Sequence, residues 1–327
     1  MKALLCKTLG TVGDLVIEET DDPQAGAGEV VMDVMAAALN FPDTLVIAGK
    51  YQIKPELPFV AGGEAAGVIC DIGEGVDDFS IGDRVVAIGA TGAFAEKMVK
   101  AAGELIRIPE SMDFLTAAGF CAAYGTSYYA LKQCANLKAG ETLLVLGAAG
   151  GVGLAAVDIG QALGATVIAA ASNDEKLATA VAAGATEKIN YSTESMKERA
   201  KEITARKGVD VVYDPVGGEL SEQALRAMAW DGRFLVIGFA AGEIPRIPLN
   251  LPLLKNCNIC GVFFGAWAQR DPAGFANNYQ ELFTMFEAGK LRPQVCHEFE
   301  LDDYVEAFAT LTERRARGKV IIKIGEI

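Results

Sequence analysis

The sequence predicts an α/β fold in which a doubly wound parallel sheet is inserted into a β-rich domain. Strands and helices alternate from about residue 122 to 262, and a glycine-rich turn joins the first of these strands to a helix. Short strand candidates separated by Gly and Pro dominate residues 1–121 instead. We therefore expect one domain at residues 1–121 and 263–327 and a second at residues 122–262, with the active site in the cleft between them.

The outer domain contains short apolar runs between turn residues, and helical periodicity is sparse there. The expected strands are residues 30–34, 66–72, 84–88 and 105–108. After the central segment we expect two amphipathic helices and a closing strand, at residues 279–287, 304–311 and 320–324. This last part of the chain is expected to pack back on the first domain.

The central segment alternates between apolar strands and amphipathic helices, which is typical of a doubly wound sheet. The expected strands are residues 143–146, 166–171, 209–213, 234–237 and 259–264. The expected helices are residues 154–163, 175–183, 195–206 and 220–228. The alternation at residues 259–264 favours an edge strand.

The glycine-rich turn, G-A-A-G-G-V-G at residues 147–153, predicts a site for a pyrophosphate. Gly150, Gly151 and Gly153 carry no side chains, so backbone N–H groups can approach an anion while the helix N-terminus offers partial positive charge. Ala148 replaces the first glycine of the G-x-G-x-x-G pattern, so the turn alone also fits an ordinary strand-to-helix connection. The complete βαβ unit around it favours a dinucleotide.

Charge and composition limit the classes of partner. The 327 residues include 29 Lys and Arg and 43 Asp and Glu, a net charge of −14 that argues against a nucleic-acid or anionic-membrane partner. No apolar run approaches the ~20 residues that span a bilayer, and Lys7 interrupts the N-terminal apolar run before it reaches the length of a signal-peptide core. We expect a cytoplasmic protein that acts on a small molecule.

Cysteine and histidine content indicates neither a disulfide framework nor a metal site. The seven cysteines are scattered and mostly flanked by apolar residues, so we expect reduced, buried thiols at Cys6, Cys70, Cys121, Cys134, Cys257, Cys260 and Cys296. The pair Cys257 and Cys260 has no second pair at zinc-site spacing. His297 is the single histidine, too few for a catalytic zinc cluster, and we expect it to have a structural role.

The end of the second central strand favours NADPH over NADH. An NAD-binding unit usually has an acidic residue there, whereas this chain has Ala171 and Ser172, and Lys176 follows where it could pair with a 2′-phosphate. We interpret Asp174 and Glu175 as residues of a helix start, with Ser172 and Glu175 forming a capping box. The alternatives are an acid that reaches the ribose and a lysine that is simply solvated.

Seven short motifs occur in a familiar order along nearly the whole chain. They are N-F-P-D-T at residues 40–44, G-K-Y at 49–51, G-E-A-A-G-V at 63–68, G-D-R-V-V at 82–86, Y-G-T-S-Y at 124–128, G-A-A-G-G-V-G-L at 147–154 and D-P-V-G-G at 214–218. With them the chain resembles the zinc-independent medium-chain dehydrogenases/reductases, specifically the quinone oxidoreductase group related to zeta-crystallin. The resemblance implies a GroES-like catalytic domain around a Rossmann domain, and hydride transfer from a nicotinamide cofactor.

The resemblance also implies roles for individual residues. Zinc-dependent relatives carry a cysteine at the position of Asn40 and a histidine at that of Gly63, so no zinc is expected here. Tyr51 matches a tyrosine of related enoyl reductases and is our candidate proton donor or substrate-orienting group, although a packing aromatic fits equally well.

The full set of expected site residues combines the resemblance with the position of late strand ends, where ligands bind. The catalytic candidates are Tyr51 and Asn40. The cofactor-binding candidates are Asn40, Thr126, Gly150, Gly151, Val152, Gly153, Ser172, Lys176, Tyr191, Gly238, Phe239 and Phe264. Phe239 and Phe264 fit a core position equally well.

We therefore expect an NADPH-dependent quinone reductase. One alternative is an NADPH-dependent reductase of activated C=C bonds in an enal, enone or enoyl thioester of coenzyme A, since fold alone does not separate these acceptors. A second alternative is an NADPH-binding protein without significant turnover. Members of the resembling family pair through an edge strand across a two-fold axis, which implies a homodimer.

Overall fold

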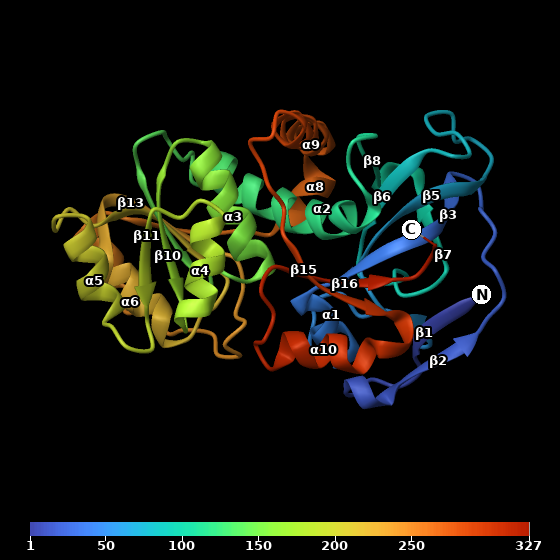
Figure 1. Ribbon diagram of the computed structural model, residues 1–327, viewed down its shortest axis with the longest axis horizontal. Coiled ribbons are helices and arrows are strands. Elements are labelled where there is room, and N and C mark those ends of the chain that lie inside the picture. The colour runs from blue at the N-terminus through green and yellow to red at the C-terminus, as the bar shows by residue number, and fades with distance from the viewer. Residues whose placement is uncertain (327) are drawn as a thin grey trace. The chain divides into compact units, whose positions relative to one another are not determined.

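The computed structural model describes residues 1–326 and consists of two compact units (Figure 1). Unit 1 comprises Met1–Ala122 and Gln294–Ile327, and unit 2 comprises Ala123–Pro293. Unit 1 is mainly antiparallel, whereas the sheet of unit 2 is entirely parallel. The α/β class with an inserted doubly wound sheet is thereby confirmed.

Unit 1 contains a three-stranded sheet of order β2-β1-β4 and a seven-stranded sheet of order β15-β16-β3-β5-β6-β8, in which β7 also pairs with β3. Its strands are β1 (Lys2–Cys6), β2 (Leu15–Glu19), β3 (Glu29–Leu39), β4 (Phe59–Val60), β5 (Glu64–Ile72), β6 (Arg84–Ile88), β7 (Lys97–Ala101), β8 (Leu105–Arg107), β15 (Val295–Glu300) and β16 (Lys319–Lys323). Helices α1 (Phe41–Ile47) and α10 (Tyr304–Thr312) belong to this unit. All five strands expected here are confirmed.

The core of unit 1 explains why β3 is longer than residues 30–34. Ala36, Ala37 and Ala38 are fully buried where β3 pairs with both β16 and β5. Alanine has a low intrinsic preference for strands, so the sequence pattern stopped short of the region where close packing selects small residues. In the same core, the rings of Phe94 and Phe308 meet edge to face with centroids 6.2 Å apart.

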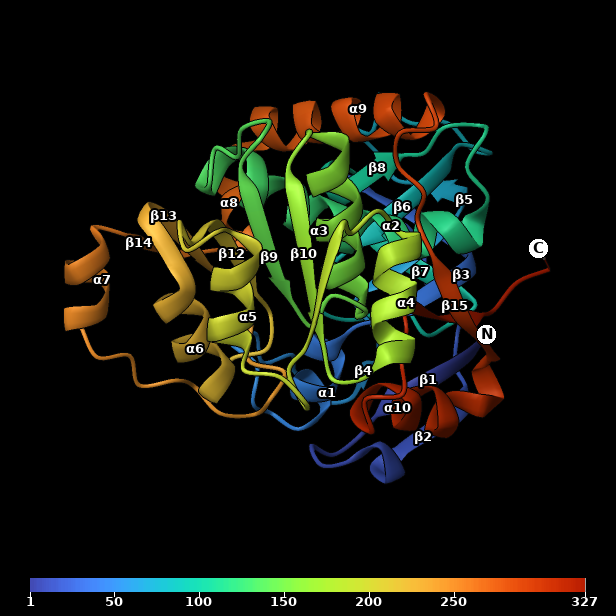
Figure 2. The same ribbon diagram turned by 60° about the vertical axis from the view of Figure 1, so that its left-hand side comes forward.

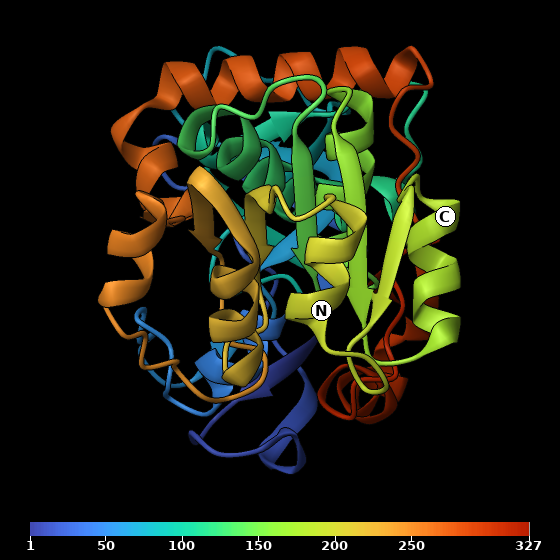
Figure 3. The ribbon, with the colours of Figure 1, turned by 90° about the vertical axis from the view of Figure 1, so that its left-hand side faces the viewer.

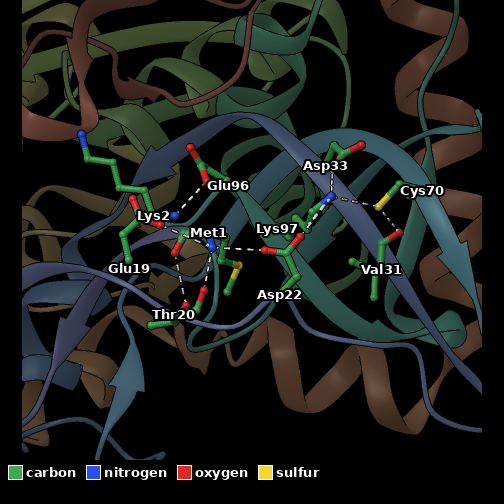
Figure 4. A network of polar contacts seen from close by, with 10 residues as sticks. All are labelled: Met1, Lys2, Glu19, Thr20, Asp22, Val31, Asp33, Cys70, Glu96 and Lys97. Carbon is green, nitrogen blue, oxygen red and sulfur yellow. Dashed lines mark hydrogen bonds and ion pairs between the residues drawn. The ribbon is translucent and has the colours of Figure 1, made fainter.

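A polar network holds the first strand of unit 1 in place (Figure 4). The amino group of Met1 donates to the Thr20 carbonyl at 2.6 Å and pairs with the Asp22 carboxylate at 3.1 Å. On β7, the ammonium of Lys97 lies 2.6 Å from the Asp33 carboxylate of β3 and 4.0 Å from Asp22. The network therefore connects the small sheet with the large one.

Unit 2 contains one six-stranded parallel sheet of order β11-β10-β9-β12-β13-β14. Its strands are β9 (Thr142–Leu146), β10 (Thr166–Ala171), β11 (Glu187–Asn190), β12 (Val209–Asp214), β13 (Met228–Val236) and β14 (Asn258–Gly261). Its helices, with α2 crossing from unit 1, are α2 (Phe114–Tyr129), α3 (Gly151–Ala162), α4 (Asp174–Ala182), α5 (Met196–Ile203), α6 (Glu219–Ala227), α7 (Asn250–Lys255), α8 (Phe264–Arg270) and α9 (Pro272–Glu287).

The order of strands in unit 2 reverses at β9. The chain moves outward from β9 to β10 and β11, then returns to the other side of β9 and continues through β12, β13 and β14. Figure 2 shows β9 beside β10 with α3 along them, and Figure 3 shows α5 and α6 side by side in front of the sheet. Dinucleotides bind outside the carboxyl ends of the strands at such a reversal.

The second domain boundary falls at Pro293 rather than at residue 262. Residues 263–293 cluster with unit 2 because α8 and α9 pack on the end of α2 and the turn after it. The rings of Tyr129 and Trp267 stack with centroids 4.2 Å apart, and the Gln133 side chain donates to Asn278 at 2.7 Å. The expected strand at residues 259–264 ends at Gly261, and it is an edge strand as expected.

His297 and the cysteines take structural positions. The Nε2 atom of His297, on β15, accepts the backbone N–H of Arg317 at 3.2 Å. The seven cysteines are free thiols, and the expectation that they are buried holds for Cys6, Cys121 and Cys257, whereas Cys296 is exposed. Within residues 1–326, no helix combines the length and apolar character needed to cross a bilayer.

Candidate active site

The first part of the site is the turn between β9 and α3 in unit 2. Gly147 has φ of +57°, a conformation that favours glycine, and Gly150 is the N-cap of α3. The backbone N–H groups of Gly151, Val152 and Gly153 lie in the first turn of α3, where an α-helix provides no internal acceptor for them. Together with the helix dipole, these donors can hold an anion such as a pyrophosphate.

Packing at the start of α3 requires glycine at position 153 but not at position 150. A Cβ atom at Gly153 would overlap the carbonyl oxygen of Gly147 and lie 3.0 Å from the Cα of Ala148. At Gly150 the nearest atom to a Cβ would be the same oxygen at 3.4 Å, an ordinary contact. Gly153 therefore allows α3 to approach β9, whereas Gly150 leaves open space beside the helix N-terminus.

The loop after β12 is organised by Asp214, which is buried. Its Oδ1 atom accepts the backbone N–H groups of Val216 at 2.8 Å and Gly217 at 2.9 Å, and its Oδ2 atom accepts the Ser221 hydroxyl at 2.5 Å. Burial raises the pKa of Asp214, and these hydrogen bonds oppose that rise. Asp214 begins the D-P-V-G-G motif, but no role was predicted for its carboxylate.

Gly238 and Phe239 lie in the loop after β13, beside the Asp214 loop. The N–H of Gly238 donates to the Asp214 carbonyl at 3.3 Å, and a Cβ at Gly217 would lie 3.0 Å from the Phe239 ring. Val216, in the Asp214 loop, also faces the glycine turn. A Cβ atom at Gly147 would lie 2.9 Å from the Cγ2 atom of Val216. The structure therefore brings these predicted residues to one edge of the sheet.

Ser172 and Tyr191 directly follow the carboxyl ends of the paired strands β10 and β11, and Lys176 lies in the helix α4 that follows Ser172. The N–H of Tyr191 donates to the Ala171 carbonyl at 3.2 Å, and the Ser192 hydroxyl donates to the Ser172 carbonyl at 2.8 Å. Lys176 is half-buried in the first turn of α4. Ser192 was not predicted, although it follows directly after Tyr191.

The expected capping box at Ser172 and Glu175 is wrong. The N-cap of α4 is Asn173, whose Oδ1 atom accepts the N–H of Lys176 at 2.9 Å. An N-cap residue must leave the helix with extended backbone angles, and Asn173 does so while Ser172 lies one residue too early. Asp174 receives a hydrogen bond from the Asn190 side chain at 3.0 Å, so its carboxylate is directed towards β11.

Thr126 lies on α2, one residue after Gly125, and Phe264 begins α8. Thr126 is half-buried next to Ser127, whose hydroxyl donates to the Val152 carbonyl at 3.1 Å. A Cβ at Gly125 would lie 2.8 Å from the Phe264 ring. Phe264 was expected at the end of a strand, but it is the first residue of α8, since β14 ends three residues earlier.

Unit 1 carries the other two predicted residues, and Asn40 lies in a buried charged cluster. The Lys319 ammonium donates to the Asn40 Oδ1 atom at 2.6 Å and lies 3.0 Å from the Glu64 Oε2 atom. The Asn40 Nδ2 atom donates to the same Glu64 oxygen at 3.0 Å, and the Ala122 N–H donates to Glu64 Oε1 at 2.6 Å. The side chains of Lys319 and Glu64 are 8% and 1% exposed.

Lys319 and Glu64 were not predicted as site residues. Glu64 stood inside a quoted motif, while Lys319 is 255 residues away in sequence and carries no signal of its own. Only the pairing of β16 with β3, where Val320 is opposite Leu39, brings Lys319 to Asn40.

Asp43 and Tyr51 complete the polar part of unit 1. The Asp43 Oδ2 atom accepts the backbone N–H of Asn40 at 2.7 Å, and burial raises the pKa of Asp43 to about 7. Tyr51 is half-buried against the hydrophobic core, and its pKa is raised by burial and by the charge of Asp43.

The residues of this cluster do not fit a zinc ion. Zinc sites use Cys, His, Asp or Glu ligands, and a catalytic site usually has three of them. Within residues 1–326, no group of three or more such side chains is arranged to hold a metal. At the polar centre of unit 1, the oxygens of Asn40 and Glu64 are already bound to the Lys319 ammonium.

Two family models match the chain. Residues 26–110 match the alcohol dehydrogenase GroES-like domain, and residues 151–283 match the model described as zinc-binding dehydrogenase. A quinone oxidoreductase-like protein 2 homolog of Nematostella vectensis is 40% identical over 98% of this chain and 88% of its own length. Quinone oxidoreductase of Pseudomonas aeruginosa is 35% identical, over 95% of this chain and 96% of its own.

Other relatives widen the range of chemistry. A 2-haloacrylate reductase of Burkholderia is 32% identical over 96% of both chains. Among solved structures, Pseudomonas syringae quinone oxidoreductase has a TM-score of 0.93 at 33% identity, covering 98% of this chain and 99% of that one. Escherichia coli quinone oxidoreductase in complex with NADPH has a TM-score of 0.91 at 29% identity, covering 99% of this chain and all of that one.

Substitution by alanine should affect stability differently at Gly150 and Gly153. We expect Gly153→Ala to lower the free energy of unfolding by about 1–3 kcal/mol, because its Cβ overlaps backbone that cannot move aside. The free energy of unfolding of Gly150→Ala should lie within about 0.5 kcal/mol of the wild-type value. Urea unfolding of both variants checks this, and equal stabilities would contradict the assigned packing role of Gly153.

Asp43 should make stability depend on pH. Its pKa is raised from 3.8 to about 7 in the folded protein, so the unfolded chain loses the proton first and stability falls as pH rises through that window. The full loss is about 4 kcal/mol, and Asp43→Asn should remove it. Urea unfolding at several pH values between about 4 and 8 measures the effect. Parallel pH profiles for the two proteins would contradict it.

Proposed function

Because the chain belongs to the quinone oxidoreductase family of medium-chain dehydrogenases/reductases, we propose that it reduces quinones with NADPH. The observation that carries the proposal is the glycine turn at the point where the strand order of unit 2 reverses. Three backbone N–H groups in the first turn of α3 have no acceptor within the helix there. Crystal structures of Escherichia coli and mycobacterial relatives in complex with NADPH support the choice of cofactor.

We propose that Gly150, Gly151, Val152 and Gly153 bind the pyrophosphate of NADPH. Ser172, Lys176 and Tyr191 would bind the 2′-phosphate, since Ser172 and Tyr191 follow neighbouring strand ends, Lys176 lies in the first turn of α4, and together they offer hydroxyl groups and a cation. Thr126 and Asn40, with Gly238, Phe239 and Phe264, are proposed to contact the nicotinamide part.

NADPH, when bound, supplies the hydride. The chain's own residues need to orient the acceptor, exclude water and handle one proton, because a quinone that accepts hydride becomes a phenolate-like anion. A metal is not required for this, and we propose a zinc-independent reaction. Tyr51 is the proposed proton donor, because a tyrosine phenol is protonated at neutral pH and burial raises its pKa further.

A second candidate function is the reduction of an activated C=C bond. The similarity to a 2-haloacrylate reductase favours it, because that acceptor is an electron-poor alkene. Hydride addition to such a bond leaves a carbanion that must be protonated, so this reaction would depend more strongly on Tyr51 than quinone reduction, where water can protonate the phenolate.

We also propose a homodimer formed through the β14 edge of unit 2. Leu249 and Leu253 are 79% and 77% exposed in the segment before β14, and Trp230 on the neighbouring β13 is 68% exposed. Exposed apolar clusters next to an unpaired strand edge are typical of protein interfaces. Sedimentation equilibrium should give twice the chain mass, and a monomer would contradict this proposal.

The cytoplasmic location stays a prediction.

The choice of acceptor is testable with Tyr51→Phe. NADPH oxidation would be followed with 1,4-benzoquinone, 9,10-phenanthrenequinone, 2-alkenals and crotonyl-coenzyme A. We expect the wild-type protein to turn over the quinones fastest and Tyr51→Phe to lower quinone turnover less than about tenfold, but alkenal turnover about 100-fold or more.

The matched control is Tyr304→Phe, which removes a hydroxyl bonded to the Leu15 carbonyl elsewhere in unit 1. Its turnover should equal that of the wild-type protein. If only crotonyl-coenzyme A were reduced fast, the protein would be a reductase of activated C=C bonds rather than of quinones. No turnover of any acceptor would favour an NADPH-binding protein without enzymatic activity.

The preference for NADPH should depend on Lys176. Loss of a charge-assisted hydrogen bond of about 1.5–3 kcal/mol predicts that Lys176→Ala lowers the ratio of kcat/KM for NADPH over NADH by about tenfold or more. Lys188→Ala removes an exposed lysine from neighbouring β11 and should leave the ratio unchanged. An unchanged ratio in Lys176→Ala would show that this lysine has no such role.

A further inference from the structure

The cluster of Asn40, Glu64 and Lys319 fixes the direction of one carboxamide. An asparagine side chain can rotate by half a turn and exchange its oxygen and nitrogen, so its orientation depends on its neighbours. Lys319 can only donate hydrogen bonds, and the Glu64 carboxylate can only accept them. The Asn40 oxygen faces the ammonium at 2.6 Å and its nitrogen faces the carboxylate at 3.0 Å.

The reversed amide would place its NH2 group against the ammonium and its oxygen against the carboxylate, with both hydrogen bonds lost. Neither partner can move aside easily. Lys319 lies on β16 and Glu64 begins β5, and both strands pair directly with β3, which ends one residue before Asn40. The Glu64 carboxylate is also held from behind by the N–H of Ala122.

The contacts leave Asn40 a defined hydrogen-bonding capacity. Its Nδ2 group has two hydrogens, which are directed to Glu64 at 3.0 Å and to the Ala38 carbonyl at 3.4 Å. Its Oδ1 atom has two lone pairs, and Lys319 takes one. These contacts leave the second lone pair of the Oδ1 atom unused. Through it, Asn40 can accept a hydrogen bond from a ligand hydroxyl or amide group.

We propose that Lys319 is a positioning residue for the reaction: its buried ammonium holds the Asn40 carboxamide with the oxygen available as the acceptor for the bound ligand. The role rests on the proposed function, in which Asn40 contacts cofactor or substrate. A purely structural Lys319, which only neutralises Glu64, predicts the same fold but no dependence of its effect on Asn40.

A double-mutant cycle separates these two roles. We expect Lys319→Met to lower kcat/KM for NADPH and quinone at least tenfold when Asn40 is present. In the Asn40→Ala background the same change should have less than about a twofold effect, because the group that Lys319 positions is gone. Equal effects in both backgrounds would overturn the positioning role.

Lys319→Met leaves the Glu64 carboxylate buried without its cation and can prevent folding. The variant Lys319→Met/Glu64→Gln removes both charges together and replaces it in the cycle. The amide of the introduced glutamine would donate where the carboxylate accepted, so the Asn40 amide is expected to reverse and the same loss in kcat/KM should appear. The control is Arg233→Met, which breaks the partly buried pair with Glu141 in unit 2 and should show no coupling with Asn40→Ala.

A second measurement does not depend on turnover. The side-chain amide signal of Asn40 in ¹⁵N NMR spectra can be identified by its loss in Asn40→Ala. We expect it to shift in Lys319→Met/Glu64→Gln and to stay in place in Arg233→Met. An unshifted signal overturns the inference even if the protein is an active quinone reductase. A shifted signal in a protein that reduces none of the acceptors rejects the proposed function instead.

Discussion

The close approach of α3 to β9 is the constraint on which the rest of unit 2 depends. The helix can begin directly after the strand only because Gly153 has no side chain to overlap the Gly147 carbonyl. The first turn of α3 therefore lies at the edge where the strand order reverses, and its N–H groups have no acceptor within the helix. Val216 in the loop after β12 lies next to Gly147 of this turn, and Phe239 in the loop after β13 lies next to Gly217. The proposed binding of a phosphate-bearing ligand at this turn therefore relies on backbone geometry rather than on special side chains.

Unit 1 contains charged side chains inside a domain, and these need partners. Burying Glu64 is costly unless a cation accompanies it, and the chain supplies that cation itself from β16. Burial raises the pKa of the nearby Asp43, although the hydrogen bond from the Asn40 N–H and the charge of Lys319 oppose that rise. The same ammonium reaches Asn40, so charge neutralisation and the orientation of one polar side chain are coupled in a single cluster.

The sequence predicted what depends on local pattern and missed what depends on distant contacts. The glycine turn, the strands beside it and most amphipathic helices were predicted because their signals lie within a few residues. Helix α2 was not predicted, because it is apolar on nearly all sides and lacks a periodic face. Lys319 could not be found for a different reason: its contact with Asn40 arises only when β16 pairs with β3. The boundary at Pro293 was missed because amphipathicity does not reveal which unit a helix covers.

We propose above all that NADPH binds to unit 2 at the carboxyl ends of the strands, where the strand order reverses at β9. Isothermal titration calorimetry of the full chain with NADPH and with NADH tests this directly and requires no acceptor. The account predicts saturable binding of one NADPH per chain, tighter than that of NADH and weakened in Gly150→Ala, where a methyl group occupies the space beside the α3 N-terminus. Absence of binding heat for both cofactors, in a chain that is folded by circular dichroism, would contradict it.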